Sequence, residues 1–375
     1  MSGAGDGLSV LVVNAGSSSI KLRLLGPDDE VLATTDLHAD RHGFDEDELR
    51  VFLHGDRPDV VGHRVVHGGT QFTDPTLIDD EVVAELGRLV ELAPLHQPAA
   101  LKGIEAVHDV LPDVASVACF DTSFHTTLPP AAFTYALPRE WLRRWPIRRY
   151  GFHGLSHAYA SRHVAELARA DGLDVDPAAL RTVVCHLGAG ASLCAVKGGR
   201  SVDTTMGFTP LEGLVMATRS GSVDPGLVLW LLRDDRLSLD DLEEGLEHES
   251  GLLGLGGSKD LRDLVDGDGP DPQAAALALD VYVHRLVTSV AAMTASLGGL
   301  DLLGFTGGVG EHDAVVRSRV AQRLAYLGVA LDAHRNDSAD GDTDVTAPGA
   351  AVRTYVVAAR EDLQIAQEAR RVVAG

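Results

Sequence analysis

The sequence predicts an α/β protein built from a duplicated domain. Residues 10–25 and 182–196 share one design, an apolar strand, a turn rich in glycine and a second apolar strand. Elsewhere, short apolar runs alternate with helical patterns, as in α/β folds. Because the two hairpins lie far apart in a chain of 375 residues, longer than one core usually covers, we expect two related domains.

The composition is that of a globular protein, with 45% hydrophobic and 23% charged residues. The formal net charge of -23 argues against nucleic acid or an anionic membrane as a partner. It does not exclude a nucleotide, because exposed charge is screened beyond ~8 Å and a few local cations decide such binding. The cysteines lack metal-like spacing and are expected as buried thiols in a reducing compartment. They are Cys119, Cys185 and Cys194.

Two features favour the cytoplasm. The first eight residues are small, polar and acidic, unlike a signal peptide. The most apolar long segment, 274–297, is interrupted by Asp280, His284 and Arg285. We therefore expect a buried helix there rather than a membrane span.

The turn of the first hairpin is suited to phosphate. From Asn14 to Ser19 it reads NAGSSS, which leaves backbone N–H groups accessible, and Lys21 adds a cation. An ordinary hairpin with a polar turn is the alternative. The spacing is not that of a P-loop, because a strand follows instead of a helix.

Two charged residues accompany the next buried strands. Arg64 lies in an apolar strand that starts at Val60, where its burial requires either an anion or an internal ion pair. Asp121 follows a strand at 114–120, at the carboxyl end where ligands of α/β sheets bind. It either holds Mg²⁺ or caps a helix. Helices are predicted between these strands at 78–92 and 99–110, with a stop at 93–98.

The middle of the chain contributes a histidine and an arginine. His153 precedes a helix predicted at 156–170 and can donate to an anion; its spacing from His157 lacks the H-E-x-x-H zinc pattern. Arg219 lies in an irregular stretch, 203–226, whose many Gly, Thr and Ser residues are typical of a binding segment. A solvated surface arginine is the alternative.

Helices are also predicted at 227–233 and 238–247. A glycine-rich bend is expected at 251–257, and Ser258 is expected to cap a short helix after it.

The last third ends with two further candidate sites. A strand at 302–305 leads into a Gly-rich turn that can accept a nucleotide, although it lacks the dinucleotide motif. A final strand at 352–358 precedes a helix opened by Glu361. This residue is either a second Mg²⁺ ligand or a helix cap.

A series of motifs spans almost the whole chain. They are NAGSSSIK (14–21), GHRVVHGG (62–69), APLHQP (93–98), FDTSFH (120–125), YGFHGLSH (150–157), the run from HLGAGAS through VKGGRSVDTTMGFTPLEGL to ATRSGSVDPG (186–226), FTGGVGE (305–311) and REDL (360–363). In identity and order they resemble the acetate kinase family, within the superfamily of acetate and sugar kinases, Hsp70 and actin.

The resemblance implies two actin-like (ribonuclease H-like) βββαβαβα domains flanking an active-site cleft, and a homodimer. By that pattern, residues 1–123 with 362–375 form one domain, and residues 124–361 form a second that binds nucleotide and dimerises. The implied reaction is reversible, Mg²⁺-dependent phosphoryl transfer from ATP to acetate, giving acetyl phosphate and ADP. Mn²⁺ is an alternative metal.

By match to family motifs, the resemblance also implies roles for individual residues. The implied catalytic residues are Arg64, Asp121, His153 and Arg219, and the implied metal ligands are Asn14 and Glu361. The small acid would contact Arg64, Val66, Leu95, Phe152 and Pro210. The nucleotide would contact Ser17, Ser19, Lys21, His186, Gly188, Ala189, Gly190, Asp260, Leu261, Arg262, Gly307, Gly308, Val309 and Gly310.

Three residues depart from the family pattern. Ala189 replaces the usual Asn of H-L-G-N-G, Leu261 replaces the Phe of D-F-R, and His312 replaces the Asn of G-E-N. These departures concern the nucleotide rather than the transferred phosphoryl group.

Other functions stay open at this point. A propionate or butyrate kinase of the same family is the nearest, although Val66 predicts a methyl-sized space that favours acetate. A sugar kinase needs a general base, for which Asp121 is the candidate, whereas acetate is already an anionic nucleophile. A non-catalytic actin-like ATP-binding module would not need Arg64 and Arg219 facing an acid.

Overall fold

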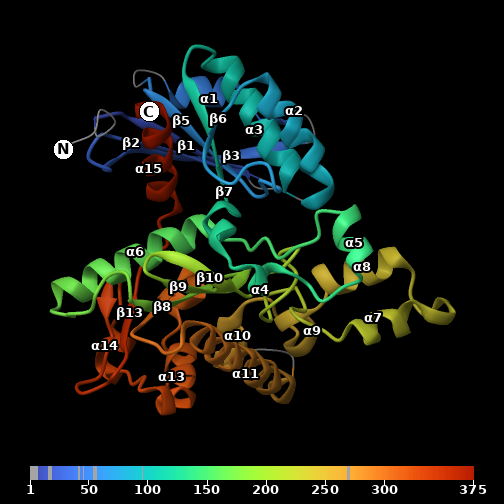
Figure 1. Ribbon diagram of the computed structural model, residues 1–375, viewed down its shortest axis with the longest axis vertical. Helices are drawn as coiled ribbons and strands as arrows, with labels where there is room; N and C mark the ends of the chain where they lie inside the picture. The colour runs from blue at the N-terminus through green and yellow to red at the C-terminus, as the bar shows by residue number, and fades with distance from the viewer. Residues whose placement is uncertain are drawn as a thin grey trace. The chain divides into compact units, whose positions relative to one another are not determined.

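The computed structural model describes residues 7–15, 19–40, 43–44, 46–53, 57–94, 96–267 and 271–375. The chain divides into two compact units (Figure 1). The first comprises Met1–Thr126, Gly154–Tyr159 and Arg360–Gly375, and the second comprises Thr127–His153 and Ala160–Ala359. Helix α6 (Gly154–Ala170) contributes its first residues to one unit and the rest to the other.

The first unit is built on a mixed sheet with strand order β4-β3-β2-β1-β5-β7-β6. Strands β1, β2 and β3 form an antiparallel meander, β5 and β7 continue parallel to β1, and β6 closes the edge antiparallel to β7. Its elements are β1 (Val10–Ala15), β2 (Ser19–Leu25), β3 (Val31–Asp40), β4 (Gly43–Phe44), α1 (Glu46–Phe52), β5 (Val60–Val65), β6 (Thr76–Leu77), α2 (Asp80–Arg88), η1 (Leu89–Leu92), α3 (Gln97–Val110), β7 (Ala115–Phe120), η2 (Ser123–Thr127) and α15 (Glu361–Ala374).

The second unit repeats this design with the order β10-β9-β8-β11-β13-β12. Again three strands form an antiparallel meander, two continue parallel, and a short strand closes the edge. The duplicated domain predicted from the two hairpins is thereby confirmed. The elements are α4 (Pro130–Phe133), α5 (Arg139–Arg144), β8 (Arg181–Leu187), β9 (Ala191–Lys197), β10 (Arg200–Thr204), α7 (Pro225–Leu232), η3 (Arg233–Asp235), α8 (Leu239–Glu247), α9 (Gly251–Gly256), α10 (Leu261–Asp266), α11 (Pro272–Leu297), β11 (Leu302–Thr306), α12 (Gly307–His312), α13 (Ala314–Arg323), η4 (Ala325–Leu327), α14 (Ala333–Asp337), β12 (Thr343–Asp344) and β13 (Arg353–Val356).

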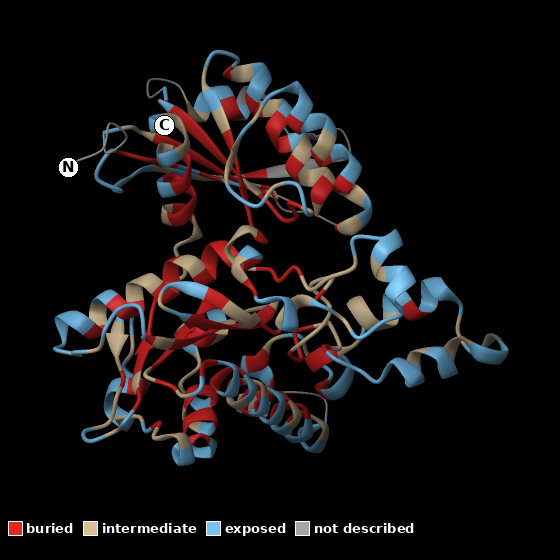
Figure 2. Cartoon of the chain, in the orientation of Figure 1, coloured by how far each residue is buried: buried red, intermediate tan, exposed pale blue. Residues whose placement is uncertain are grey.

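Helices cover both faces of the first sheet. Because side chains alternate along a strand, Val10 and Val12 pack toward α15, while Leu11 and Val13 pack toward α1 and α3. Figure 2 shows the resulting burial of the strands. A strand buried on both faces has to be apolar throughout, which is why the sequence shows continuous apolar runs here.

The second sheet lies between α6 on one face and α11 on the other. Val164 of α6 packs against Val184 and Tyr355, and α11 packs against β8, β9 and β10. By length and composition α11 could cross a membrane. One side of the helix is instead buried in this unit, from Ala275 to Leu297, which confirms the buried helix predicted there.

Two local predictions were wrong, and one helix starts slightly earlier than predicted. Residues 251–256 form helix α9 rather than a bend, with the left-handed Gly251 (φ 65°) at its start. The stop predicted at 93–98 is confirmed, since η1 ends at Leu92; the next helix, α3, begins at Gln97, two residues before its predicted start, because Pro98 is compatible with a first helical turn. Asp260 rather than Ser258 caps α10, accepting from the Arg262 N–H at 3.0 Å.

A buried arginine fixes the short helix α12. Arg317 of α13 is 1% exposed and donates to the carbonyl oxygens of Gly310 (3.0 Å) and Glu311 (2.8 Å). It also donates to the Asn336 side chain (2.8 Å) and the Asn336 carbonyl (2.6 Å). One guanidinium therefore satisfies carbonyls at the end of α12 and holds α14 against it.

We expect Arg317→Met to lower the free energy of unfolding by about 3 kcal/mol, because several buried acceptors lose their donor at once. Urea unfolding followed by circular dichroism measures this. Arg319→Met on the same helix is the matched control. Its ion pair with Asp280 is exposed, so about 0.5 kcal/mol or less is expected. Equal losses in the two variants would contradict an anchoring role for Arg317.

Candidate functional site

In the first unit, a charged cluster forms where three neighbouring strands end. Asn14 lies near the end of β1, Arg64 near the end of β5, and Asp121 directly after β7. The three strands are adjacent and parallel, so their carboxyl ends meet at one edge of the sheet. Glu361, the first residue of α15, joins them.

Arg64 lies at the centre of this cluster. Its Nε and Nη2 donate to the two carboxylate oxygens of Asp121 at 3.2 and 2.6 Å, and its Nη1 donates to Asn14 Oδ1 at 3.1 Å. Glu361 Oε2 lies 3.8 Å from Nε. The ion pair left open by the sequence therefore exists, and Asp121 engages Arg64 through both carboxylate oxygens.

Burial and the neighbouring charges shift the pKa values of Arg64 and Glu361. Burial alone would lower the pKa of Arg64, but the carboxylates of Asp121 and Glu361 raise it above its ordinary value. Burial raises the pKa of Glu361, and the charges of Asp121 and Asp362 add to this while Arg64 opposes it. Two carboxylates face one guanidinium, so the ionised cluster is negative and attracts a further cation.

The oxygen atoms of this cluster suit Mg²⁺. Amide and carboxylate oxygens are its preferred ligands, and it commonly uses one or two protein carboxylates together with water and substrate phosphates. No group of three or more His, Cys, Asp and Glu side chains that could hold a metal occurs within the described ranges. A metal here would thus depend on Asn14, Asp121, Glu361 and oxygens from substrate.

Gly154 allows close packing at Asp121. Its N–H donates to the Asp121 carbonyl at 2.8 Å, and a Cβ at this position would lie 2.1 Å from that oxygen. A side chain at residue 154 would therefore displace the aspartate.

In the second unit, His153 and Arg219 approach the same turn. His153 Nδ1 lies 2.9 Å from the Ser192 hydroxyl, and its ring lies 4.3 Å from that of His186. A Cβ on Gly190 would lie 3.4 Å from His153 Nε2 and 3.7 Å from Arg219 Nη1. Gly190 thus keeps the space beside both side chains clear.

His153 has strained backbone geometry. With φ 56° and ψ 25° it is left-handed, which is uncommon for a residue other than glycine, and it sits at the N-cap of α6. Such outliers persist where surrounding structure holds them and concentrate at functional sites.

Arg219 is held from several sides. Its Nε lies 2.9 Å from Glu247 Oε2, and its carbonyl accepts from the Met216 N–H at 3.2 Å. The Ala217 N–H donates to the Ala189 carbonyl at 3.1 Å. The irregular segment is therefore fixed against the β8–β9 turn, and the solvated surface arginine considered above does not apply.

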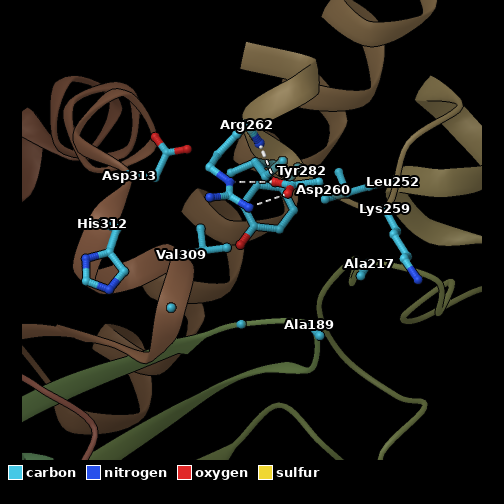
Figure 3. Close-up of a pocket in the computed structure, with 13 residues that line it drawn as sticks. Ala189, Ala217, Leu252, Lys259, Asp260, Arg262, Tyr282, Val309, His312 and Asp313 are labelled. Atoms are coloured by element: carbon cyan, nitrogen blue, oxygen red, sulfur yellow. Dashed lines mark hydrogen bonds and ion pairs between the residues drawn. The ribbon is translucent and has the colours of Figure 1, made fainter. Parts of the chain in front are cut away.

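Gly188 and Ala189 of this turn also line a pocket of about 570 Å³ (Figure 3). This volume is in the range of small-molecule sites. Its lining comes from the β8–β9 turn, the 217 segment and α9 to α13. The lining residues are Gly188, Ala189, Ala217, Leu252, Lys259, Asp260, Leu261, Arg262, Tyr282, Gly308, Val309, His312 and Asp313.

Two of the charged side chains that line this pocket form an ion pair with each other. Arg262 donates to Asp260 through Nε at 3.0 Å and Nη2 at 2.6 Å, as the dashed lines in Figure 3 show. The side-chain hydrogen bond from Arg262 lowers the pKa of Asp260 to about 2. The pair is consequently ionised at neutral pH.

The structure distributes the residues predicted for the nucleotide over several places. Seven of them line the pocket, namely Gly188, Ala189, Asp260, Leu261, Arg262, Gly308 and Val309. Gly307 and Gly310 are buried in α12, and His186 and Gly190 belong to the His153 group. Ser19 and Lys21 lie in β2 of the first unit, and Ser17 lies outside the described residues.

The residues predicted for the small acid are not gathered in one unit. Val66 belongs to the first unit, and Phe152 and Pro210 belong to the second. Leu95 lies outside the described residues. This pocket therefore remains a prediction.

Sequence reasoning missed several pocket residues, among them Ala217, Leu252, Lys259, Tyr282 and Asp313. None belongs to a distinctive motif. Tyr282 lies within the buried helix predicted at 274–297, but nothing in the pattern shows that this side chain lines a pocket.

Comparison with known proteins gives consistent results. Residues 56–367 match the model of the acetokinase family. A protein of Gloeobacter violaceus named acetate kinase is 49% identical over 323 residues, 86% of this chain and 78% of that protein. The crystal structure of Porphyromonas gingivalis acetate kinase has a TM-score of 0.87 at 35% identity. A propionate kinase from Francisella tularensis subsp. tularensis has a TM-score of 0.88 at 34% identity. Each of the two structures covers 97% of this chain and is covered over 99% of its own.

Proposed function

The chain belongs to the acetokinase family, and we propose that it transfers a phosphoryl group from ATP to acetate through the groups described above. It is a phosphotransferase with a carboxyl acceptor, as its relatives are named. The observation that carries the proposal is the turn from Gly188 to Gly190. Its residues Gly188 and Ala189 line a pocket of about 570 Å³, and Gly190 leaves room beside His153 and Arg219.

The chemistry of acyl phosphate formation explains the choice of residues. Acetate needs no general base, because its carboxylate is already a nucleophile. Transfer instead needs positioning and neutralisation of the charge that spreads over the phosphoryl oxygens. Arg219, held by Glu247, and His153, held by Ser192, are donors of fixed orientation that can supply it.

The first unit supplies the other charges. Arg64 binds the carboxylate of the acid, with its guanidinium oriented by Asp121 and Asn14. Asn14, Asp121 and Glu361 hold Mg²⁺, which neutralises phosphate charge when bound. The pocket of the second unit holds the nucleoside of ATP.

The acid substrate is acetate in this proposal, and propionate is the second candidate. The similarity to a structure named propionate kinase supports propionate as the second candidate. Val66, which is 8% exposed at the end of β5, is proposed to face the methyl group of the acid. Since one methylene is worth only ~1–3 kcal/mol in such a pocket, propionate is expected to react more slowly rather than not at all.

Hydroxylamine trapping of acyl phosphate tests the function. With ATP and Mg²⁺, we expect strong hydroxamate formation with acetate, less with propionate and least with butyrate. Val66→Ala is expected to raise the propionate-to-acetate ratio, and an unchanged ratio would remove Val66 from the acid pocket. ADP release with sugars, and no hydroxamate from any acid, would refute the acyl kinase.

Arg219→Ala is expected to lower turnover by roughly 10²-fold or more, as loss of one preorganised donor typically does. Steady-state kinetics in the acetyl phosphate direction measures this. The matched control is Arg335→Ala, which removes an exposed ion pair with Asp344 in the same unit and is expected to leave turnover unchanged. Near-normal turnover of Arg219→Ala would exclude the proposed role.

The protein is also proposed to act in the cytoplasm as a homodimer. Helix α7 reads PGLVLWLL and has no buried residue. A helix that is apolar on all sides is normally buried. Leu227, Leu229 and Trp230 are 45%, 63% and 52% exposed, and Figure 2 shows α7 among the exposed elements. A second copy of the chain is the proposed cover for this helix.

Leu229→Asp is expected to convert the dimer to a monomer in light scattering after gel filtration, because it places a charge in an apolar contact. The control is Leu277→Asp on α11, where Leu277 is similarly exposed at 58%. We expect the control to remain dimeric. A wild-type monomer, or a dimer retained by Leu229→Asp, would contradict this interface.

A further inference from the structure

The hydroxyl of Tyr282 is an unusual group in the second unit. Tyr282 lies in α11 and is 3% exposed. Its hydroxyl is buried and has no hydrogen-bond partner among the described residues. Because buried polar groups nearly always have a partner, an isolated one requires an explanation.

This tyrosine also lines the pocket proposed for the nucleoside. Figure 3 shows its ring beside the Asp260–Arg262 pair, with the hydroxyl end turned toward Val309. The side chain therefore does not end in the apolar core, although its helix packs there. It ends at the wall of the pocket, where its hydroxyl is enclosed.

The other lining residues offer few hydrogen bonds to a buried ligand. Five of them are apolar: Ala189, Ala217, Leu252, Leu261 and Val309. Asp260 and Arg262 engage each other, and Asp313 caps α13 by accepting from the Val316 N–H at 2.8 Å. Lys259 and His312 are exposed. Tyr282 is thus the buried polar side chain of this lining.

The hydroxyl is preorganised to donate. Burial raises the pKa of Tyr282 above its ordinary value, so the phenol stays protonated at neutral pH. The neighbouring residues of α11 on the same face, Leu279, Val283 and Leu286, are buried and fix the helix. A ligand that pairs with this hydroxyl has little ordering to impose.

We propose that the Tyr282 hydroxyl donates a hydrogen bond to the nucleoside part of the bound nucleotide. It thereby supplies a polar contact in a pocket whose Ala189 side chain can supply none. This makes Tyr282 a determinant of nucleotide affinity. The inference rests on the proposed function, since it takes the pocket to be the nucleoside site.

Isothermal titration of the whole protein with ADP tests this contact. Tyr282→Phe removes only the oxygen, and we expect ADP to bind roughly five- to tenfold more weakly, as for loss of one neutral hydrogen bond. Tyr326→Phe is the matched control, since Tyr326 is 70% exposed, and its affinity for ADP is expected to equal that of the wild type. Unchanged ADP affinity in Tyr282→Phe would overturn the proposal.

Two further measurements separate recognition from a structural role. Tripolyphosphate, which lacks the nucleoside, is expected to bind wild type and Tyr282→Phe equally; an equal loss for ADP and tripolyphosphate would overturn nucleoside recognition. The thermal stability of ligand-free Tyr282→Phe is expected to match or exceed the wild type, because an unpaired buried hydroxyl is removed. A lower melting temperature with unchanged ADP affinity would show that the hydroxyl is structural.

Analogues locate the accepting atom. ADP derivatives that lack the 2′-hydroxyl, the 3′-hydroxyl or one ring nitrogen are titrated into both proteins. The analogue without the acceptor is expected to bind both with equal affinity. If every analogue keeps the full difference between the two proteins, no nucleoside atom pairs with Tyr282 and the proposal fails.

The binding assays also distinguish this inference from the proposed function. If wild-type protein binds ADP but forms no acyl phosphate, the proposed reaction fails, while the ADP affinity of Tyr282→Phe still decides the role of the hydroxyl. If acyl phosphate forms and Tyr282→Phe binds ADP like the wild type, only the inference fails.

Discussion

The burial of both faces of each sheet is the constraint on which the candidate sites depend. Strands β1, β5 and β7 in the first unit, and β8 in the second, are covered by helices on both sides. Charged side chains in the middle of such strands would be buried without partners. Within the sheets, polar groups are therefore confined to the strand ends, where parallel neighbours bring distant parts of the sequence together.

The two copies of the domain use equivalent strand ends in different ways. In the first unit, Arg64 lies near the end of β5 and Asp121 directly after β7, so this edge of the sheet carries charge. In the second unit, the turn after β8 reads Gly-Ala-Gly and α12 starts with two glycines after β11. Gly307 has φ 78° and no room for a Cβ beside the Leu187 carbonyl. One copy has charge at its strand ends, and the other has space. This division suits a reaction that needs both cations and a cavity for a nucleoside.

The sequence was most informative where a single period dominated. The hairpins at β1–β2 and β8–β9 were predicted because apolar runs flank turns of small residues. Short apolar runs bounded by such turns are typical of buried strands. The glycines at 251–257 led to the wrong prediction of a bend. The chain forms helix α9 there, because Gly251 adopts the left-handed backbone at its start and the helix is packed through its buried residues. Ion-pair partners could not be predicted from the sequence. The pattern showed that a buried Arg64 needs an anion or an internal ion pair, but only the fold brings Asp121, 57 residues away in sequence, within 2.6 Å. The same limit applies to Arg219, which lies in an irregular segment while its partner Glu247 ends helix α8, and to the hydroxyl of Tyr282.

The short helix α12 shows how a glycine-rich element of marginal stability is made rigid. Glycine weakens a helix, and α12 contains three in six residues. Arg317 compensates from inside by satisfying the carbonyls of Gly310 and Glu311. Glu311 in turn accepts from the Ala359 N–H at 3.0 Å. Ala359 is the last residue of the second unit before the chain enters the first at Arg360, with Glu361 following. Within the second unit, α12 is therefore held from two sides, by the buried Arg317 at its carbonyls and by the Ala359 N–H at its Glu311 side chain. The acceptors around Arg317 in turn offset the cost of burying its charge.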